Sequence, residues 1–370
     1  METTAEKKTP LHEQHLAAGG KMVPFAGFTM PIQYPTGIRA EHQAVREGAG
    51  MFDVSHMGEF WVAGPDAEAF TQFMTVNDVS VTDVGQAQYS ALCNEEGRVL
   101  DDLLVYRLDG RFLLVVNASN REKDWNWLQR YADGYDVNLS DASDRTALIA
   151  LQGPQAQPIL GTLTDLDLDA VGYYRFSEGS VAGAQGIISR TGYTGEDGFE
   201  LYLPAEKAAG VWTSLMEAGK PHGLIPAGLG ARDSLRLEMG YALYGNDLDE
   251  EHTALESGLG WIVKLDAGEF VGRAALARQK EEGVQVRLTG VRLEERGFPR
   301  PGYPLVSDGE DVGAVTSGVL SPSVGCGVAL GYLPRELAKS GTPVGVRIRD
   351  GVVPGVTQRP PFYGGGSVKR

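Results

Sequence analysis

The sequence predicts an α+β protein that ends in a separate β domain. Its 370 residues are enough for two or three domains, and its 49 glycines and 19 prolines favour tight turns and much β structure. Residues 89–117 have the pattern of a meander, with strands joined by short turns. Beyond about residue 283, short apolar runs separated by Gly, Pro and Asp predict an antiparallel barrel or jelly-roll-like unit.

Helices and strands alternate in the first part of the chain without the spacing of a parallel sheet, which indicates an α+β arrangement. Residues 38–48 have helical periodicity and stop at a glycine that can end the helix. A short strand at 59–64 precedes Asp66, which is placed to cap a helix reaching residue 74. Residues 20–34 are apolar and broken by Gly and Pro, so we expect irregular buried chain there.

The elements that follow continue in the same mixed manner. Within the meander, strands are expected at 89–93, 99–108 and 111–117. Further helices are expected at 121–131, 155–163, 205–218, 228–238 and 272–280, and further strands at 147–152, 199–203 and 258–264. The strand at 99–108 is central in the meander, so both of its edges should be paired.

Two adjacent carboxylates, Asp101 and Asp102, interrupt that otherwise apolar central strand. Side chains alternate along a strand, so the two should lie on opposite faces, Asp102 with Leu100 and Leu104. Burying an unpaired carboxylate is costly, and such a group usually takes up a proton instead. Either the pair binds backbone amides near a turn, or one member acts in a cleft as an acid, a base or a stabiliser of positive charge.

The composition excludes several classes of protein. A formal charge of -16 and a pI near 4.9 argue against nucleic acid and anionic membranes as partners, since binding either depends on clustered Lys and Arg. No apolar run approaches the roughly 20 residues of a membrane span. Cys93 and Cys326 cannot build a disulfide framework, and the first residues lack a signal-peptide pattern. We therefore expect a cytoplasmic protein.

Patterns for metal or nucleotide binding are weak. His12 and His15 have ligand spacing, but no third ligand follows, so solvated histidines on a helix face are expected. The acidic stretch at 244–251 lacks calcium-ligand spacing and is also expected to be solvated. The glycines at 192–198 match neither a dinucleotide fingerprint nor a Walker loop, so they predict a tight hairpin or a loop that approaches a ligand closely.

Two further side chains have both a structural and a functional interpretation. Arg232 and Arg236 lie four residues apart on a predicted helix, and Asp233 can offset the charge of Arg236. Arg232 is then left without an anion, which either an interdomain salt bridge or a ligand would supply. His56 lies between two apolar segments, and an interior histidine is favoured over a catalytic one.

Several separated segments match one family in the same order. They are Gly20-Lys21-Met22-Val23, Phe25-Ala26-Gly27, residues 51–57, 97–105, 151–154, 192–198, 230–238 and 243–247, and Thr316-Ser317-Gly318. Over essentially its full length the chain resembles the T protein of the glycine cleavage system, the folate-binding aminomethyltransferase family. The resemblance implies a three-domain cloverleaf: two interleaved antiparallel-sheet α+β domains in 1–282, the second at roughly 53–145, around a central folate hole, and the C-terminal β domain at 283–370.

The resemblance also implies an activity. In this family an aminomethyl group on the lipoyl arm of H protein is split, which releases ammonia and passes a one-carbon unit to tetrahydrofolate as 5,10-methylenetetrahydrofolate. Tetrahydrofolate would be a co-substrate and H protein the partner, with no metal and no nucleotide. An acidic carrier would be repelled by a chain of charge -16 unless basic residues cluster locally.

Site residues follow from the resemblance position by position. Asp102 matches the family's essential carboxylate, Glu200 matches an acid that contacts the pterin, and Arg232 matches a substrate-site arginine. The other matches, all to residues around the folate, are Tyr193, Trp261, Val115, Asn117, Tyr89 and Tyr173. Asp102 is then the functional member of the acidic pair, and Asp101 is expected to bind backbone or solvent at the edge of the strand.

These residue types suit the implied chemistry. Attack by folate N5 with loss of ammonia develops positive charge, which a fixed carboxylate in a dry cleft stabilises. A carboxylate such as Glu200 can accept from the donor edge of a pterin, and aromatic rings can stack on its plane. Arg232 can pair with a carboxylate of the glutamyl tail or orient an acid.

Three alternative functions are weaker. A protein of the same fold that assists iron–sulfur cluster assembly would carry a Lys-Gly-Cys motif, but here the corresponding segment is Glu238-Met239-Gly240-Tyr241. A folate-dependent demethylase often has a fused flavoprotein half, for which this chain has neither a nucleotide fingerprint nor spare length. The third alternative is a β-rich scaffold that acts only by binding other proteins.

Overall fold

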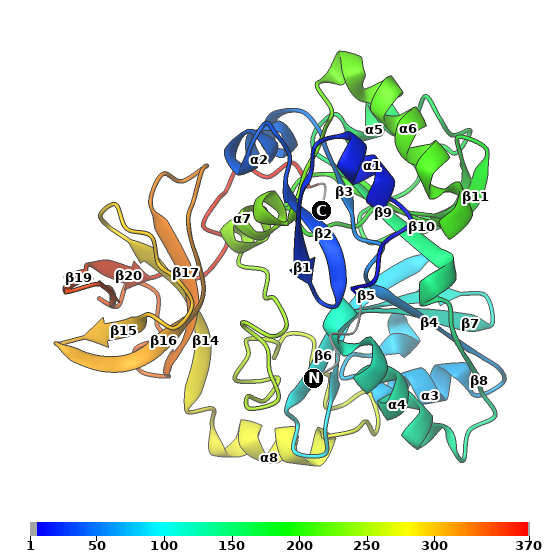
Figure 1. The fold of residues 1–370 in the computed structure, drawn as a ribbon. Coiled ribbons are helices and arrows are strands. Elements are labelled where there is room, and N and C mark those ends of the chain that lie inside the picture. Colours follow the sequence, from blue (N-terminus) through cyan, green and yellow to red (C-terminus); the bar gives the residue numbers. More distant parts are fainter. Residues whose placement is uncertain (1–5, 369–370) are drawn as a thin grey trace.

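Three sheets occupy separate parts of the molecule and give it a three-lobed α+β architecture (Figure 1). The computed structural model describes residues 6–368. The sheets have six, five and seven strands, and a two-stranded hairpin lies in front of them. This arrangement confirms the expected fold class, including the β domain at the carboxyl end.

The six-stranded sheet has the order β10-β11-β12-β9-β3-β13, and β3 and β13 form its one parallel pair. Its strands are β3 (Gly50–Asp53), β9 (Thr146–Gln152), β10 (Phe176–Val181), β11 (Ala184–Ser189), β12 (Gly198–Pro204) and β13 (Ile225–Pro226). Helices α5 (Ala156–Leu160) and α6 (Ala208–Gly219) cover one face, where Trp212 and Leu215 pack on strand residues such as Ile149.

The five-stranded sheet has the order β5-β6-β7-β4-β8. Its strands are β4 (Gly58–Ala63), β5 (Gln86–Cys93), β6 (Val99–Leu108), β7 (Arg111–Val116) and β8 (Asn138–Asp141). One face packs against the six-stranded sheet through Tyr106 and Val115, which share a core cluster with Leu148 and Tyr202. The other face packs against α3 (Ala67–Met74) and α4 (Arg121–Ala132).

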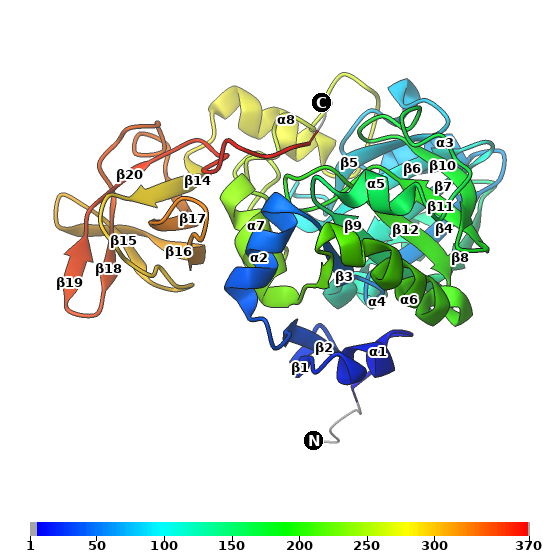
Figure 2. The same cartoon turned by 90° about the horizontal axis from the view of Figure 1, so that it is seen from above.

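The seven-stranded sheet is nearly closed, because an isolated bridge joins Val356 of β20, at one end of the sheet, to Pro343, just before β18 near the other end. Its strands are β14 (Val286–Leu293), β15 (Pro304–Ser307), β16 (Glu310–Leu320), β17 (Gly327–Pro334), β18 (Gly345–Ile348), β19 (Gly351–Val353) and β20 (Gly355–Thr357). This barrel has its own apolar core, which includes Val291, Leu305 and Val346. Both views show it at one side of the molecule, reached through α8 (Arg273–Glu282) (Figures 1 and 2).

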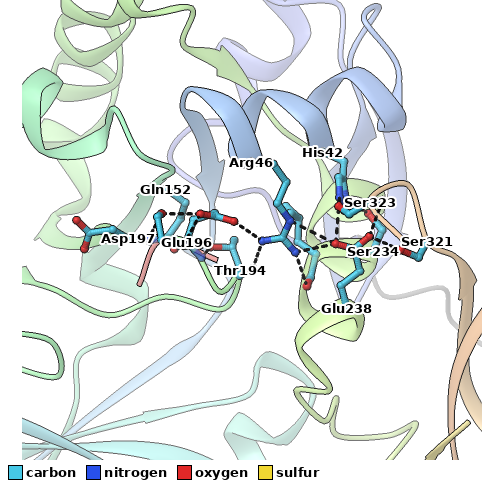
Figure 3. Close-up of polar contacts among 12 residues, drawn as sticks. His42, Arg46, Gln152, Thr194, Glu196, Asp197, Ser234, Glu238, Ser321 and Ser323 are labelled. Carbon is cyan, nitrogen blue, oxygen red and sulfur yellow. Dashed lines mark hydrogen bonds and ion pairs between the residues drawn. The ribbon is translucent and has the colours of Figure 1, made fainter. Parts of the chain in front are cut away.

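Helices α2 (Ile38–Glu47) and α7 (Leu229–Met239) lie between the six-stranded sheet and the barrel (Figures 1 and 2). A buried ionic network joins them to both neighbours (Figure 3). Arg46 binds Glu196 at 2.7 Å and Glu238 at 2.8 Å, and Glu238 also accepts from Ser323 N of the barrel at 2.9 Å. His42 Nδ1 lies 2.8 Å from Ser234 Oγ. The network therefore fixes the barrel relative to the loop before β12.

Three expectations about local structure are wrong. Residues 20–34 form a hairpin of β1 (Lys21–Phe25) and β2 (Phe28–Gln33) rather than irregular chain. The strand expected at 258–264 is absent, and that stretch consists of turns. The helix expected to start after Asp66 is present, but the Asp66 carboxylate accepts from Asp136 N at 2.8 Å instead of capping it.

The histidines expected to be solvated are buried, and so is one acid of the stretch at 244–251, whereas Glu250 and Glu251 of that stretch are exposed as expected. His15 on α1 (His12–Ala17) is fully buried, with Nε2 2.8 Å from Asp53 Oδ2, and His12 is 7% exposed. In the acidic stretch, Asp247 is fully buried and accepts from Arg236 at 2.7 Å. Long-range partners therefore outweigh the local polar pattern at these positions.

Candidate active site

Asp102 lies on β6, and side chains from two adjacent strands hold its carboxylate. Tyr89 on β5 donates its hydroxyl to Oδ2 at 2.9 Å. Asn117, just after β7, donates Nδ2 to Oδ1 at 2.9 Å. Because β6 pairs with both β5 and β7, the sheet brings these three side chains together.

The environment of Asp102 opposes its ionisation. Burial and the charge of Asp101 raise the pKa of Asp102 to about 7, although the hydrogen bonds from Tyr89 and Asn117 act to lower it. A carboxyl group with this pKa exchanges its proton near neutral pH, as a group with an acid–base or electrostatic role does.

Asp101 faces the opposite side of β6 and is fully buried. Its Oδ2 accepts from Asn117 N at 2.9 Å, and its Oδ1 accepts from Asn117 Nδ2 at 2.9 Å and from Asn120 Nδ2 at 2.6 Å. The expectation that Asp101 binds backbone is confirmed, and its burial excludes solvent as the partner. Asn117 therefore bridges the two carboxylates.

Leu100 does not share the face of Asp102 as the alternation of side chains predicts. The pairing of β5 with β6 shifts register between Leu92 and Cys93, which leaves one extra residue on β6. Leu100 consequently packs in the same cluster as Leu103 and Val105, on the side of Asp101. A bulge next to the acidic pair is a local feature that the period of a regular strand does not anticipate.

Trp261 adds an aromatic surface beside Asp102. Its ring stacks on Tyr89 with centroids 6.0 Å apart and an interplanar angle of 22°. The side chain is 65% exposed, so the ring has surface left for a further planar group. Trp261 comes from a turn, where a large side chain can remain exposed.

Tyr193 and Arg232 form a second part of the site. The Tyr193 ring stacks on Tyr241 with centroids 5.7 Å apart, its hydroxyl donates to Ala242 O, and Arg232 Cζ lies 4.5 Å from its centroid. Within residues 6–368, the half-buried Arg232 side chain has no hydrogen bond or ion pair. The interdomain salt bridge is therefore absent among the described residues, and Arg232 remains a cation without an anion.

Glu200 on β12 is buried next to this arginine. Thr191 Oγ1 donates to its Oε2 at 2.5 Å, while Oε1 accepts from no described residue. Burial raises the pKa of Glu200, and the Thr191 hydrogen bond and the charge of Arg232 oppose that rise. Glu200 therefore has one oxygen available to accept from a ligand.

The two parts of the site influence each other electrostatically. Burial is the main cause that raises the pKa of Tyr193, and the charge of Asp102 raises it further. Arg232 likewise acts on the pKa of Glu200 and on that of His56, which is 2% exposed. Together the acids, the arginine and the exposed ring can bind a planar molecule that carries both donors and an anionic group, and can stabilise a positive charge near Asp102.

The comparisons with known proteins agree with this arrangement. Residues 11–267 match the GCVT N-terminal domain, and residues 287–364 match the glycine cleavage T-protein C-terminal barrel domain. The chain belongs to the glycine cleavage T-protein family.

Named relatives of the T-protein family cover nearly the whole chain. The aminomethyltransferase of Desulfitobacterium hafniense is 50% identical over 347 residues, 94% of this chain and 95% of the relative. That of Moorella thermoacetica is 50% identical over 358 residues, 96% of this chain and 98% of the relative. The crystal structure of glycine cleavage system aminomethyltransferase T from Bartonella henselae is 36% identical, has a TM-score of 0.91, and is matched over 98% of this chain and 99% of that one.

Two of the expected folate-site residues make apolar or aromatic contacts. Val115 is 4% exposed and belongs to the apolar core between the two sheets. Tyr173 is partly exposed, and its ring packs edge-on against Tyr174 with centroids 4.9 Å apart. The described cavities of about 610 and 380 Å³ are lined by other residues than the candidate set.

Sequence reasoning missed two polar residues beside the acidic pair. Asn120 follows Asn117 at a spacing of three in a short 3₁₀ turn, and this Asn-x-x-Asn spacing after a strand was the available signal. Asp124 follows Glu122 and Lys123, so it has the local pattern of an exposed helix start. Among the described residues, no group of His, Cys, Asp and Glu side chains is arranged to hold a metal ion.

Proposed function

We propose that this aminomethyltransferase moves the one-carbon unit from the aminomethyl-lipoyl arm of H protein to tetrahydrofolate, forming 5,10-methylenetetrahydrofolate and releasing ammonia. The observation that carries the proposal is the Asp102 carboxylate, which Tyr89 and Asn117 each hold at 2.9 Å, together with Arg232, a cation without an anion that lies over the Tyr193 ring. The names of the closely similar relatives support the same reaction class.

The residues present fit tetrahydrofolate as a co-substrate. Glu200 has an oxygen free to accept from the donor edge of a pterin, and Arg232 would pair with a carboxylate of the glutamyl tail. Trp261 offers an exposed ring for stacking with an aromatic part of the folate. These three contacts would supply orientation, which is a large part of catalysis in group transfer.

The ionised carboxylate of Asp102 would stabilise the positive charge that develops on the reacting group. Loss of ammonia places positive charge on the transferred carbon, and a carboxylate that cannot move away from it lowers the energy of that state. Tyr89 and Asn117 hold the carboxylate, so little reorganisation is needed when the charge appears. Partial burial strengthens the interaction because the local dielectric is lower than that of water.

Asp102→Asn tests the role of the carboxylate. We expect folate binding within about tenfold of wild type, or ~1.4 kcal/mol, while methylene transfer collapses. The assay follows ammonia and methylenetetrahydrofolate released from an aminomethyl-loaded lipoyl protein, and binding is measured separately by fluorescence or calorimetry.

Asp109→Asn is the matched control, because Asp109 is an exposed acid in the turn that ends β6 and should leave turnover unchanged. Normal turnover by Asp102→Asn would show that Asp102 is not the essential carboxylate. If the wild-type protein gives no product with a cognate carrier, the transferase assignment itself is wrong.

A further inference from the structure

Asp124 is a buried carboxyl group that the proposed reaction does not use. It lies in the first turn of α4, is fully buried, and neither of its oxygens accepts from a donor among residues 6–368. Its carboxyl faces that of Asp101 within hydrogen-bonding reach. Two carboxylates provide no donor, so one of the pair must carry a proton for a hydrogen bond to form between them.

The contacts decide which of the two is protonated. Asp101 accepts three N–H groups, one on Oδ2 and two on Oδ1, so its negative charge is well satisfied. Asp124 accepts none, so no hydrogen bond would offset the unfavourable desolvation free energy of its ionised form. The proton therefore belongs on Asp124, and Asp101 is the anion.

The charged groups around Asp124 agree with this assignment. Burial, the charges of Asp101 and Asp102, and the contact with Asp101 all raise the pKa of Asp124 well above its usual range. Lys123 is the opposing group, but its ammonium is bound to Glu250 and Tyr244, each at 2.8 Å. The pKa of Tyr244 is raised mainly by burial, and the charges of Asp101 and Asp124 raise it further.

We propose that Asp124 stays protonated at neutral pH and donates to Asp101, acting as a positioning residue that keeps the Asn117 amide directed at Asp102. The link is continuous, because Asn117 Nδ2 lies 2.9 Å from both Asp101 Oδ1 and Asp102 Oδ1. A fixed Asp101 therefore fixes the amide that holds Asp102. Only the catalytic consequence rests on the proposed function, whereas the protonation of Asp124 does not.

Infrared difference spectroscopy tests the protonation directly. In heavy water at a pD above 8, subtracting the Asp124→Asn spectrum from the wild-type spectrum should leave one carboxylic-acid C=O band. The subtraction is needed because burial also raises the pKa of Glu59, a second buried carboxyl without a hydrogen-bond partner among the described residues, and any acid band from Glu59 is common to both spectra. Glu122→Gln is the matched control: Glu122 is an exposed acid on the same helix, and its replacement should remove a carboxylate band. A carboxylate band lost in Asp124→Asn would overturn the proposal.

A second pair of variants tests the positioning role. Asn keeps a donor for Asp101, whereas Leu has similar size and no donor. Asp124→Asn should keep kcat within about twofold and leave the acid limb of the pH profile in place, while Asp124→Leu should lower kcat by about tenfold with little change in KM for folate. Equal losses in both variants, or an acid limb that moves to lower pH in Asp124→Asn, would overturn the role. If the wild-type protein has no transferase activity, the proposed function fails, and the infrared result still decides the protonation.

Discussion

At the scale of single residues, the site holds carboxyl groups in surroundings that oppose their ionisation. The pKa of Asp102 is raised from 3.8 to about 7 by burial and by the charge of Asp101. Between these two values the folded protein binds more protons than the unfolded chain does. Stability therefore falls as the pH rises through this window, the reverse of the usual behaviour of a paired acid.

Removing the charge of Asp102 should consequently stabilise the fold at alkaline pH. We expect Asp102→Asn to raise the free energy of unfolding at pH 8 by about 1–3 kcal/mol, and to have little effect at pH 4, where the wild-type carboxyl is protonated. Urea unfolding at the two pH values measures the difference. A variant less stable than wild type at pH 8 would show that the hydrogen bonds to the ionised Asp102 outweigh the effects of burial and of the Asp101 charge.

The hydrogen bond from Tyr89 gives a second prediction at this scale. This bond lowers the pKa of Asp102, so Tyr89→Phe should move the acid limb of the transferase pH profile upward from about 7 by about one unit. Tyr131→Phe removes a hydroxyl that binds Glu95 instead, and it should leave the profile unchanged. A limb that stays in place in Tyr89→Phe would mean that another group controls it.

At the scale of elements, α2 and α7 act as a joint between the sheets and the barrel (Figure 3). Glu238 on α7 is fully buried and binds Arg46 and Ser321. Burial opposes its ionisation, but hydrogen bonds from His42, Ser321 and Arg46 outweigh burial and lower the pKa of Glu238 to about 2. The stabilisation from this group is present above about pH 4.5 and is lost as the pH falls toward 2.

Glu238→Gln should weaken this joint. Arg46 would keep Glu196 as its only carboxylate partner, and we expect a loss of about 3 kcal/mol in the free energy of unfolding at pH 7. The loss should shrink at low pH, because the wild-type protein loses the same interaction there. Glu47→Gln, an exposed acid on α2, is the control and should change stability little in denaturant titrations.

At the scale of the whole molecule, the final segment of the chain connects the barrel to α7. Phe362 is 8% exposed and packs with Leu237 of α7 and with Val328 and Leu330 of β17. Ser367 N donates to Glu196 Oε2 at 2.8 Å, so the same segment also reaches the loop before β12.

Phe362→Ala should therefore destabilise the molecule and weaken the coupling between the barrel and the sheets. We expect about 3 kcal/mol of lost stability and a barrel that unfolds before the sheets in calorimetry. Phe298→Ala is the control, because Phe298 is 48% exposed and its loss should cost at most about 0.5 kcal/mol. A single unshifted transition in Phe362→Ala would show that this contact does not couple the barrel to the rest.

The sequence predicts elements whose signals are local and misses those set by distant partners. The meander strands and α2 follow from periodicity and turn residues, and the structure has them within a few residues of the expected positions. The β1–β2 hairpin was missed because Pro24 and Pro31 argue against strands, yet a two-stranded hairpin tolerates them at its free edges. His15 was misjudged because its burial depends on Asp53, which follows 38 residues later.

The same distinction applies to the site. The Asp101-Asp102 pair stands out because two charges interrupt an apolar strand, and the family resemblance selects Asp102. Asp124 gives no such signal, because a charged residue in the first turn of a helix is ordinary. Its significance arises only from tertiary structure, which places it against Asp101 in the core.

The strand order of the six-stranded sheet also affects how the chain can fold during synthesis. β3 leaves the ribosome early, but its sheet partners β9 and β13 end at residues 152 and 226. The five strands of the neighbouring sheet all lie between residues 58 and 141 and can pair first. At ordinary translation rates β3 therefore waits roughly 10–30 s for its last partner, and Met51 and Phe52 stay unpaired until β9 has been made. During that interval the nascent chain exposes a short apolar segment of the kind that chaperones bind.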